Sequence, residues 1–220
     1  RDLQRTSYYP GATAANISNT TSINSGSVFS LSSSKPAIVG SSLYIGDNVR
    51  LFKYNAFNVS QELDRSGGIS ALYITGPTVW DDYVYVTSGS TYYQINNSNL
   101  SQTIATFSPG SSSWNSPIVY DGNIFFATTG SDVLYKNNAS NISQVIESVA
   151  KTNCAGDFAI DGDNLYISCS ATFLQLNASN ISQTINQYTT SGSVNQRGGI
   201  TIGGGYAYLT TSSELVHQLN

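Results

Sequence analysis

Short runs of alternating hydrophobic and polar residues follow one another along most of the chain, and no stretch keeps the spacing of an amphipathic helix. The most apolar runs are rich in aromatic and β-branched residues, as expected of strands that are buried on both faces. They are Leu43–Ile45, Tyr83–Val86, Ile124–Phe126, Leu165–Ile167 and Tyr206–Leu209. Acidic turn signals such as Asp121-Gly122 precede three of these runs, which is typical of hairpins. The pattern predicts an all-β chain.

One phrase, Asn-x-Ser-Asn-apolar-Ser-Gln, recurs along the chain. It is complete at 96–102, 138–144 and 177–183, and weaker copies lie at 55–61 and 15–18. Its second Asn falls at positions 16, 58, 99, 141 and 180, so the spacings are 42, 41, 42 and 39 residues. Four short antiparallel strands fit each period, which is the signature of a propeller blade. We therefore predict a five-bladed β-propeller with four antiparallel strands per blade.

The phrase also sets the predicted bounds of the blades. Taking it as the start of each repeat gives blades at about 16–57, 58–98, 99–140, 141–179 and 180–220. In this division the phrase is a turn between blades, and Glu214–Leu219 is the fourth strand of the last blade. Arg1–Ala15 remains as an extended N-terminal segment, suited to pair with a sheet edge of a neighbouring copy or to fold back on its own blade.

Two stretches resemble known propeller families. The run Ser116–Phe126, followed by Val133–Tyr135 and Asn138–Ser140, resembles the blade repeat of quinoprotein-like (PQQ-like) propellers. The turn Asn141–Ser143 is similar to a turn of surface proteins with LVIVD-type repeats. The resemblance implies a fold and by itself no activity. The Trp-centred docking motif of quinone-dependent enzymes is missing, because Trp80 and Trp114 lie outside any repeated position, so no cofactor is expected.

Composition narrows the choice of partners. Charged residues make up only 10% of the chain, the net charge is -4, and Ser, Thr and Asn together supply about a third of the residues. Nine scattered cations offer no footprint for phosphates, so nucleic acid is not an expected partner. No apolar run reaches the roughly 18 residues of a membrane span. The chain starts at Arg1 and contains no methionine, so we expect either a mature chain from which a targeting segment has been removed or a fragment of a longer chain.

The two cysteines, Cys154 and Cys169, flank the Asp161-Gly162 turn with 14 residues between them. This spacing is close to the register of one hairpin, so the two side chains can lie opposite each other on neighbouring strands. A disulfide is the expected outcome in an oxidising compartment, and two buried free thiols are the alternative. Two thiols without histidine partners cannot form a zinc site.

The sequence holds nine Asn-x-Ser/Thr sequons, and eight of them lie in the repeated turn. They are Asn16, Asn19, Asn58, Asn96, Asn99, Asn138, Asn141, Asn177 and Asn180. As candidate acceptors for N-linked glycans, we predict that at least half of them are modified, most of all Asn58, Asn99, Asn141 and Asn180, which share one register. The alternative, compatible with the first, is that Asn and Ser stabilise the turn through local hydrogen bonds.

The sequence contains few residues that could act in catalysis. The single histidine, His217, lies among apolar residues, where a structural role is expected. The acidic pairs Asp81-Asp82 and Asp161/Asp163 could bind calcium or act as paired carboxylates, but each is also an ordinary hairpin turn, and we favour the turn. We predict no catalytic, cofactor or metal site, and no enzyme.

Two functions fit these features. The first is an extracellular or cell-surface glycoprotein with a structural role: a subunit of a filament, appendage or surface layer that assembles from copies of itself. The segment Arg1–Ala15 would connect neighbouring copies. The alternative is a glycan- or ligand-binding propeller that uses exposed tyrosines such as Tyr92 and Tyr93 as stacking platforms.

Overall fold

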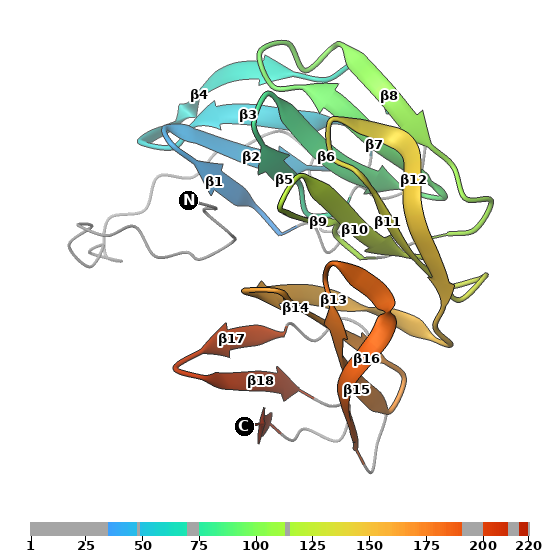
Figure 1. The fold of residues 1–220 in the computed structure, drawn as a ribbon. Helices are drawn as coiled ribbons and strands as arrows, with labels where there is room; N and C mark the ends of the chain where they lie inside the picture. Colours follow the sequence, from blue (N-terminus) through green and yellow to red (C-terminus); the bar gives the residue numbers. More distant parts are fainter. Residues whose placement is uncertain are drawn as a thin grey trace.

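The computed structural model describes residues 35–47, 49–69, 75–112, 115–190, 200–210 and 216–219. These residues form only β-structure, in five antiparallel sheets that follow one another around a common centre (Figure 1). Each sheet is a simple meander in which consecutive strands are neighbours. The sheets are the blades of a five-bladed β-propeller, so the predicted fold class is confirmed.

Four sheets have four described strands each. Sheet I contains β1 (Ala37–Val39), β2 (Ser42–Gly46), β3 (Leu51–Asn55) and β4 (Asn58–Arg65). Sheet II contains β5 (Thr78–Trp80), β6 (Tyr83–Ser88), β7 (Thr91–Asn96) and β8 (Thr103–Phe107). Sheet III contains β9 (Ile118–Tyr120), β10 (Asn123–Ala127), β11 (Val133–Asn138) and β12 (Asn141–Ala150). Sheet IV contains β13 (Cys154–Asp161), β14 (Asn164–Cys169), β15 (Thr172–Asn177) and β16 (Asn180–Thr189). Sheet V has three described strands, β17 (Thr201–Gly203), β18 (Tyr206–Thr210) and β19 (Val216–Leu219).

The sheets begin one strand later in the repeat than the predicted blade bounds. Strand β4, which begins at Asn58, pairs with β3, so it closes sheet I and does not open the second blade. The repeated phrase is therefore a hairpin turn inside each blade and not a turn between blades. A sequence period gives the length of the repeat but not which strands pair, which explains the error. The predicted segment 1–15 and the start of the predicted first blade lie outside the described residues.

The last strand is the clearest case of this shift. The prediction made Glu214–Leu219 the fourth strand of the fifth blade, but β19 pairs with β18 as the third strand. Its counterparts are β3, β7, β11 and β15, each of which pairs on its other side with a fourth strand. Among the described residues, no strand pairs with that other edge of β19.

The core lies between consecutive blades. One hydrophobic cluster joins sheets I and II, a second joins II and III, a third joins III and IV, and a smaller one joins IV and V. In the turns of sheets II, III and IV the apolar residue enters the cluster shared with the preceding blade: Leu100 is 1% exposed, and Ile142 and Ile181 are fully buried. Burying such a side chain contributes about 1.5–3 kcal/mol. The turns therefore help to hold neighbouring blades together.

Tight turns within the blades have the predicted residues. Asp121 and Gly122 both adopt positive φ, at 46° and 70°, as a two-residue type I′ hairpin requires. Asp81 opens the matching turn of sheet II with φ 52°. Asp and Gly tolerate this left-handed backbone better than branched residues do, which accounts for their position here.

Candidate functional site

The first Asn of each phrase closes the hairpin turn between the third and fourth strands. Its Oδ1 accepts a hydrogen bond from the backbone N–H two residues later, at 2.8–2.9 Å. Its Nδ2 donates to the Oε1 of the Gln that ends the phrase, at 2.9–3.0 Å. The Asn–Gln pairs are Asn55–Gln61, Asn96–Gln102, Asn138–Gln144 and Asn177–Gln183. The local hydrogen-bonding interpretation of the phrase is therefore confirmed for these residues.

The second Asn of each phrase has a different environment. Its Oδ1 accepts from the backbone N–H of the Ser two residues later, at 3.2–3.3 Å. Its side chain is exposed, and within the described part of the chain its Nδ2 makes no hydrogen bond. These residues are Asn58, Asn99, Asn141 and Asn180.

The sequons thus fall into two groups. Asn96, Asn138 and Asn177 use Nδ2, the atom that a glycan would occupy, to hold the turn. The four exposed Asn residues of the second position leave that atom open to solvent. Asn16 and Asn19 lie outside the described residues. Glycosylation stays a prediction at all nine positions, and the geometry favours the second position.

A cross-strand pair on the third and fourth strands recurs in sheets I to IV, and in sheets I, II and III it faces the turn of the following blade. We call it the turn-receiving pair. Its members are two residues before the first Asn of the phrase and six residues after the second. The pairs are Lys53/Asp64, Gln94/Ala105, Lys136/Glu147 and Gln175/Asn186.

The first three pairs hold the following turn by direct hydrogen bonds. Lys53 Nζ donates to the Asn97 carbonyl at 2.9 Å, and Asp64 accepts from the Leu100 N–H at 2.7 Å. Gln94 serves both roles in sheet II: its Nε2 donates to the Ala139 carbonyl at 3.2 Å and its Oε1 accepts from the Ile142 N–H at 3.1 Å. Because the turns of sheets II, III and IV each contact the pair of the blade before, these three turns follow one another along one rim of the propeller.

Sheet III holds the turn of sheet IV with two residues of opposite charge, Lys136 and Glu147. Lys136 Nζ donates to the Ser179 carbonyl at 2.8 Å, and the Glu147 carboxylate accepts from the backbone N–H groups of Ile181 and Ser182 at 3.0 and 2.9 Å. Burial by itself would raise the pKa of Glu147, but the hydroxyl of Ser182, these two N–H groups and the charge of Lys136 together lower it below its ordinary value. The ionised carboxylate is therefore the form that binds the turn.

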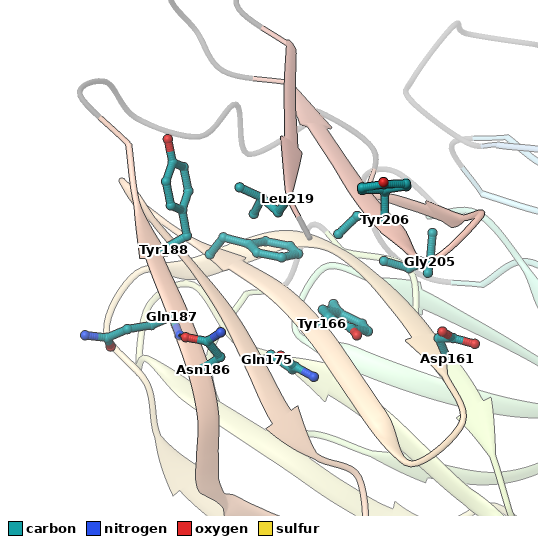
Figure 2. Close-up of a pocket in the computed structure, with 12 residues that line it drawn as sticks. Asp161, Tyr166, Gln175, Asn186, Gln187, Tyr188, Gly205, Tyr206 and Leu219 are labelled. Carbon is teal, nitrogen blue, oxygen red and sulfur yellow. The ribbon is translucent and has the colours of Figure 1, made fainter.

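A groove of about 260 Å³ lies between sheets IV and V, beside the fourth turn-receiving pair (Figure 2). Gln175 and Asn186 line it from sheet IV, together with the rings of Tyr166 and Tyr188. Sheet V contributes residues including Tyr206 and Leu219. The groove thus combines side-chain amides with aromatic and aliphatic surface.

The predicted disulfide is present. Cys154 and Cys169 are directly opposite each other on β13 and β14 and are bonded. Both side chains are buried in the cluster between sheets III and IV. The bond therefore joins the first two strands of the fourth blade inside the core.

The other candidate residues take structural places. His217 lies on β19 with its Nδ1 3.4 Å from the Tyr188 hydroxyl. Asp81 is a turn residue, and Asp163, at the turn after β13, accepts a hydrogen bond from the Tyr120 hydroxyl at 3.1 Å. In the part of the chain that the structure describes, no three His, Cys, Asp or Glu side chains lie close enough together to hold a metal ion.

The expectation that Tyr92 is an exposed stacking platform is wrong. Its ring is fully buried, and the centroid of the ring is 4.0 Å from the centroid of the Phe126 ring. Its hydroxyl donates a hydrogen bond to the Ala127 carbonyl at 3.0 Å. Tyr93 is half-buried against the cluster between sheets I and II. Alternation sends the two rings to opposite faces of the blade, and a neighbouring blade covers each face, so neither face is free.

Sequence reasoning missed the turn-receiving pairs. An alignment of the repeats places Lys53, Gln94, Lys136 and Gln175 in one column, all of them long polar residues in otherwise apolar strands. A long polar residue at a strand position that should be buried signals a specific hydrogen-bond partner. The sequence therefore indicated that these residues have specific hydrogen-bond partners, but it did not indicate which residues the partners are.

Comparison with solved structures agrees with the fold. BamB from Moraxella catarrhalis superposes with a TM-score of 0.70 at 11% identity, over 84% of this chain and 57% of BamB. The computationally designed protein Ika8 superposes with a TM-score of 0.71 at 10% identity, over 84% of this chain and 57% of Ika8. The WD40 domain of Neurospora crassa Pan2 superposes with a TM-score of 0.64 at 9% identity, over 84% of this chain and 59% of that domain. This chain spans less than two thirds of each of these proteins, and likeness at such identity shows the fold alone.

The comparisons support part of the resemblance seen in the sequence. BamB is a PQQ-like propeller, and a WD40 domain and a designed protein match as well, so the comparisons support the β-propeller fold that the resemblance implied. No known protein family and no curated protein matches the sequence. The likeness to LVIVD-type repeats therefore stays a prediction. The described residues contain no helix long and apolar enough to cross a bilayer.

Proposed function

We propose that this chain is an extracellular glycoprotein with a structural role, a subunit of a surface filament, appendage or layer built from contacts between copies. The observation that carries the proposal is the row of exposed sequons, Asn58, Asn99, Asn141 and Asn180, at the same position of four consecutive turns. A buried disulfide supports an oxidising compartment, in which N-glycosylation can also take place.

Glycans at these four positions would cover one rim of the propeller. The turns of sheets II, III and IV lie along that rim, because each of these three binds the turn-receiving pair of the blade before it. Sugars there would keep that rim free of protein neighbours and leave the opposite face and the outer strands for contacts between copies. A chain low in charge and rich in hydroxyl and amide groups suits a role outside the cell better than recognition of a charged partner.

We also propose that the protein is not an enzyme. The acidic side chains that could have formed a catalytic pair serve the turns, and His217 lies against Tyr188. The alternative of a glycan-binding propeller called for exposed tyrosines such as Tyr92 and Tyr93, but Tyr92 is fully buried and Tyr93 is half-buried. We do not pursue that alternative.

The first experiment is glycopeptide mass spectrometry of the protein from its native source, combined with electron microscopy of the same material. We expect glycans at Asn58, Asn99, Asn141 and Asn180 and an ordered polymer. Unmodified peptides across all four sites would overturn the glycoprotein proposal. A protein found only as a monomer would overturn the structural one.

Matched variants make the glycosylation test sharper. In a host that glycosylates sequons, Asn141→Gln should remove one glycan from the protein. Asn138→Gln changes a sequon only three residues away but should leave the glycan mass unchanged, because its Nδ2 is engaged with Gln144. The opposite pattern would show that the hairpin geometry does not select the acceptor.

A further inference from the structure

We propose that the β16 strands of two copies of this chain pair with each other edge to edge, antiparallel and centred on Gln187, so that sheet IV of one copy continues into sheet IV of the other. The inference names the surface through which copies meet, and it rests on the proposed function only in that copies of the chain associate. It begins from a comparison of the outer edges of the four-stranded sheets.

The fourth strand of each four-stranded sheet is an edge strand. Among the described residues, no strand pairs with the outer edge of β4, β8, β12 or β16. Each of these strands also has a β-bulge five residues after the second Asn of its phrase, at Leu63, Ile104, Ile146 and Ile185. Because a bulge bends the strand and interrupts regular pairing, the part of each edge that can receive another strand is the part after the bulge.

The residues after the bulge differ in charge among the four strands. Natural proteins protect exposed edges with charged side chains, with proline or by keeping the edge short. In β4 only Asp64 and Arg65 follow the bulge, and in β8 only three residues do. In β12 four residues follow, among them Glu147, and Lys151 comes directly after the strand. In β16 the four residues Asn186–Thr189 are all exposed, and none is charged or proline. The edge of β16 is therefore the least protected of the four.

The backbone of β16 directs hydrogen-bonding groups outward at Gln187. In an antiparallel sheet the N–H and C=O of one residue point to the same side, and successive residues alternate. The Gln187 N–H donates to Oδ1 of Asn186, an exposed side chain of its own strand, at 2.9 Å. This bond places the N–H of Gln187, and with it the C=O, on the outer edge. Because a hydrogen bond to an exposed side chain contributes little to stability, a strand of a second copy can replace it.

Two β16 strands satisfy each other when they meet about Gln187. With Gln187 of one copy opposite Gln187 of the other, each N–H donates to the C=O across the contact, as in the hydrogen-bonded pairs of an antiparallel sheet. Asn186 then lies opposite Tyr188, and Ile185 lies opposite Thr189. Like charges directly opposite each other destabilise such a pair, and a charged strand that meets its own copy risks this arrangement. A neutral strand is therefore suited to a partner identical to itself.

The predicted glycan leaves this contact free. Asn180 begins β16 and lies about 20 Å from Gln187 along an extended strand. Lys151 of sheet III also contacts β16 before the bulge, where its Nζ is 3.1 Å from the Thr184 hydroxyl. The residues that pair are thus clear of both the sugar and this cation. A twofold contact of this kind joins two copies and no more, so a polymer needs a second surface that links such pairs.

A single cysteine tests the contact directly. Gln187→Cys in the whole chain should form a disulfide-linked dimer under mild oxidation, because hydrogen-bonded residues across an antiparallel pair have Cα atoms about 5.5 Å apart, a distance that a disulfide spans. Cys154 and Cys169 are already bonded to each other. Ser148→Cys is the matched control, because Ser148 is exposed at the same position of β12. Equal cross-linking of the two variants, or none for Gln187→Cys, would overturn the proposal.

Association without a cross-link gives a second readout. Sedimentation velocity at increasing protein concentration should show a weak wild-type dimer, because the contact is small. Gln187→Lys should raise its dissociation constant by about fivefold or more, since two like charges then lie opposite each other, and Ser148→Lys should leave the constant unchanged. A wild type that stays monomeric throughout, or an equal effect of both lysines, would overturn the proposal. An ordered polymer that Gln187→Lys leaves intact would overturn it while the proposed function stands.

Discussion

Equivalent residues line the interface between sheets III and IV and the interface between sheets IV and V. Those of the first interface bind a turn, whereas those of the second line a groove. In the first, Lys136 and Glu147 bind the turn of the next blade, and Ile181 is fully buried behind it. In the second, Gln175 and Asn186 line an open groove, and the cluster of buried residues is smaller. The comparison teaches that the inserted turn, and not the contact of the sheets alone, completes the packing between blades.

The largest expected effect on stability comes from removing a buried side chain from the interface between sheets III and IV. Ile181→Ala removes a fully buried side chain and leaves a cavity in the cluster between sheets III and IV, so the free energy of unfolding should fall by about 4 kcal/mol. Thermal denaturation followed by circular dichroism measures the loss. Ile185→Ala is the control, because Ile185 is 49% exposed on the same strand. Equal losses for the two variants would contradict the role given to the turn.

The disulfide is expected to matter almost as much. The double substitution Cys154→Ala/Cys169→Ala removes a bond that closes a loop of sequence separation 15, which should cost about 3 kcal/mol in the chain-entropy model. Denaturant titration of the variant, beside wild type with and without reductant, measures it. If reduced wild type keeps its full stability, the bond does not stabilise the fourth blade.

Acid should weaken the interface between sheets III and IV through Glu147. Its pKa is lower in the folded protein than the ordinary value of 4.5, so its contribution is complete above that value and disappears as the pH falls through the lowered pKa. Glu147→Gln should cost about 1–2 kcal/mol at pH 7 and much less at pH 3.

The measurement for Glu147 is the Tm of wild type and variant at several pH values between 7 and 3. Glu62→Gln is the matched control, because Glu62 forms only a surface ion pair with Arg65. A Glu147→Gln protein whose Tm falls with pH as steeply as that of wild type would show that another group carries the acid sensitivity.

The smallest expected effect on stability comes from the hairpin turn between β11 and β12. Gln144→Ala removes the exposed hydrogen bond from Asn138 Nδ2, 3.0 Å long, and should cost about 0.5 kcal/mol. It should also free the Asn138 amide, so this sequon should gain glycan in a glycosylating host. Glycopeptide analysis checks the second effect. A sequon that stays unmodified in Gln144→Ala would mean that the hydrogen bond is not what protects it.

The fold could be predicted because the information for it is local and repeated. Alternation gave the strands, Asp121-Gly122 and its counterparts gave the hairpins, and the recurring phrase gave the number of blades. The spacing of Cys154 and Cys169 across one turn was enough to pair them. Each of these signals depends on residues close together in the chain.

What could not be predicted depends on contacts between blades. The period is the same whichever strand begins the blade. The predicted blade bounds, and the predicted position of β19 within its blade, were therefore wrong by one strand. The burial of Tyr92 requires the Phe126 ring of the next blade, which alternation within one strand does not reveal. The partners of Lys53, Gln94 and Lys136 lie about 40 positions away in the following repeat, in the turn that the sequence suggested was free.

The turn-receiving pair also gives the repeat a direction. Sheets II and III each present a turn to the blade before and a pair to the blade after, so the two sides of such a blade are different but complementary. A gene that gains or loses one whole repeat, measured from turn to turn, still produces blades whose facing sides match. Duplication and recombination can therefore change the number of blades without inventing a new interface, and the curvature of the sheets is what limits how many can close into one ring.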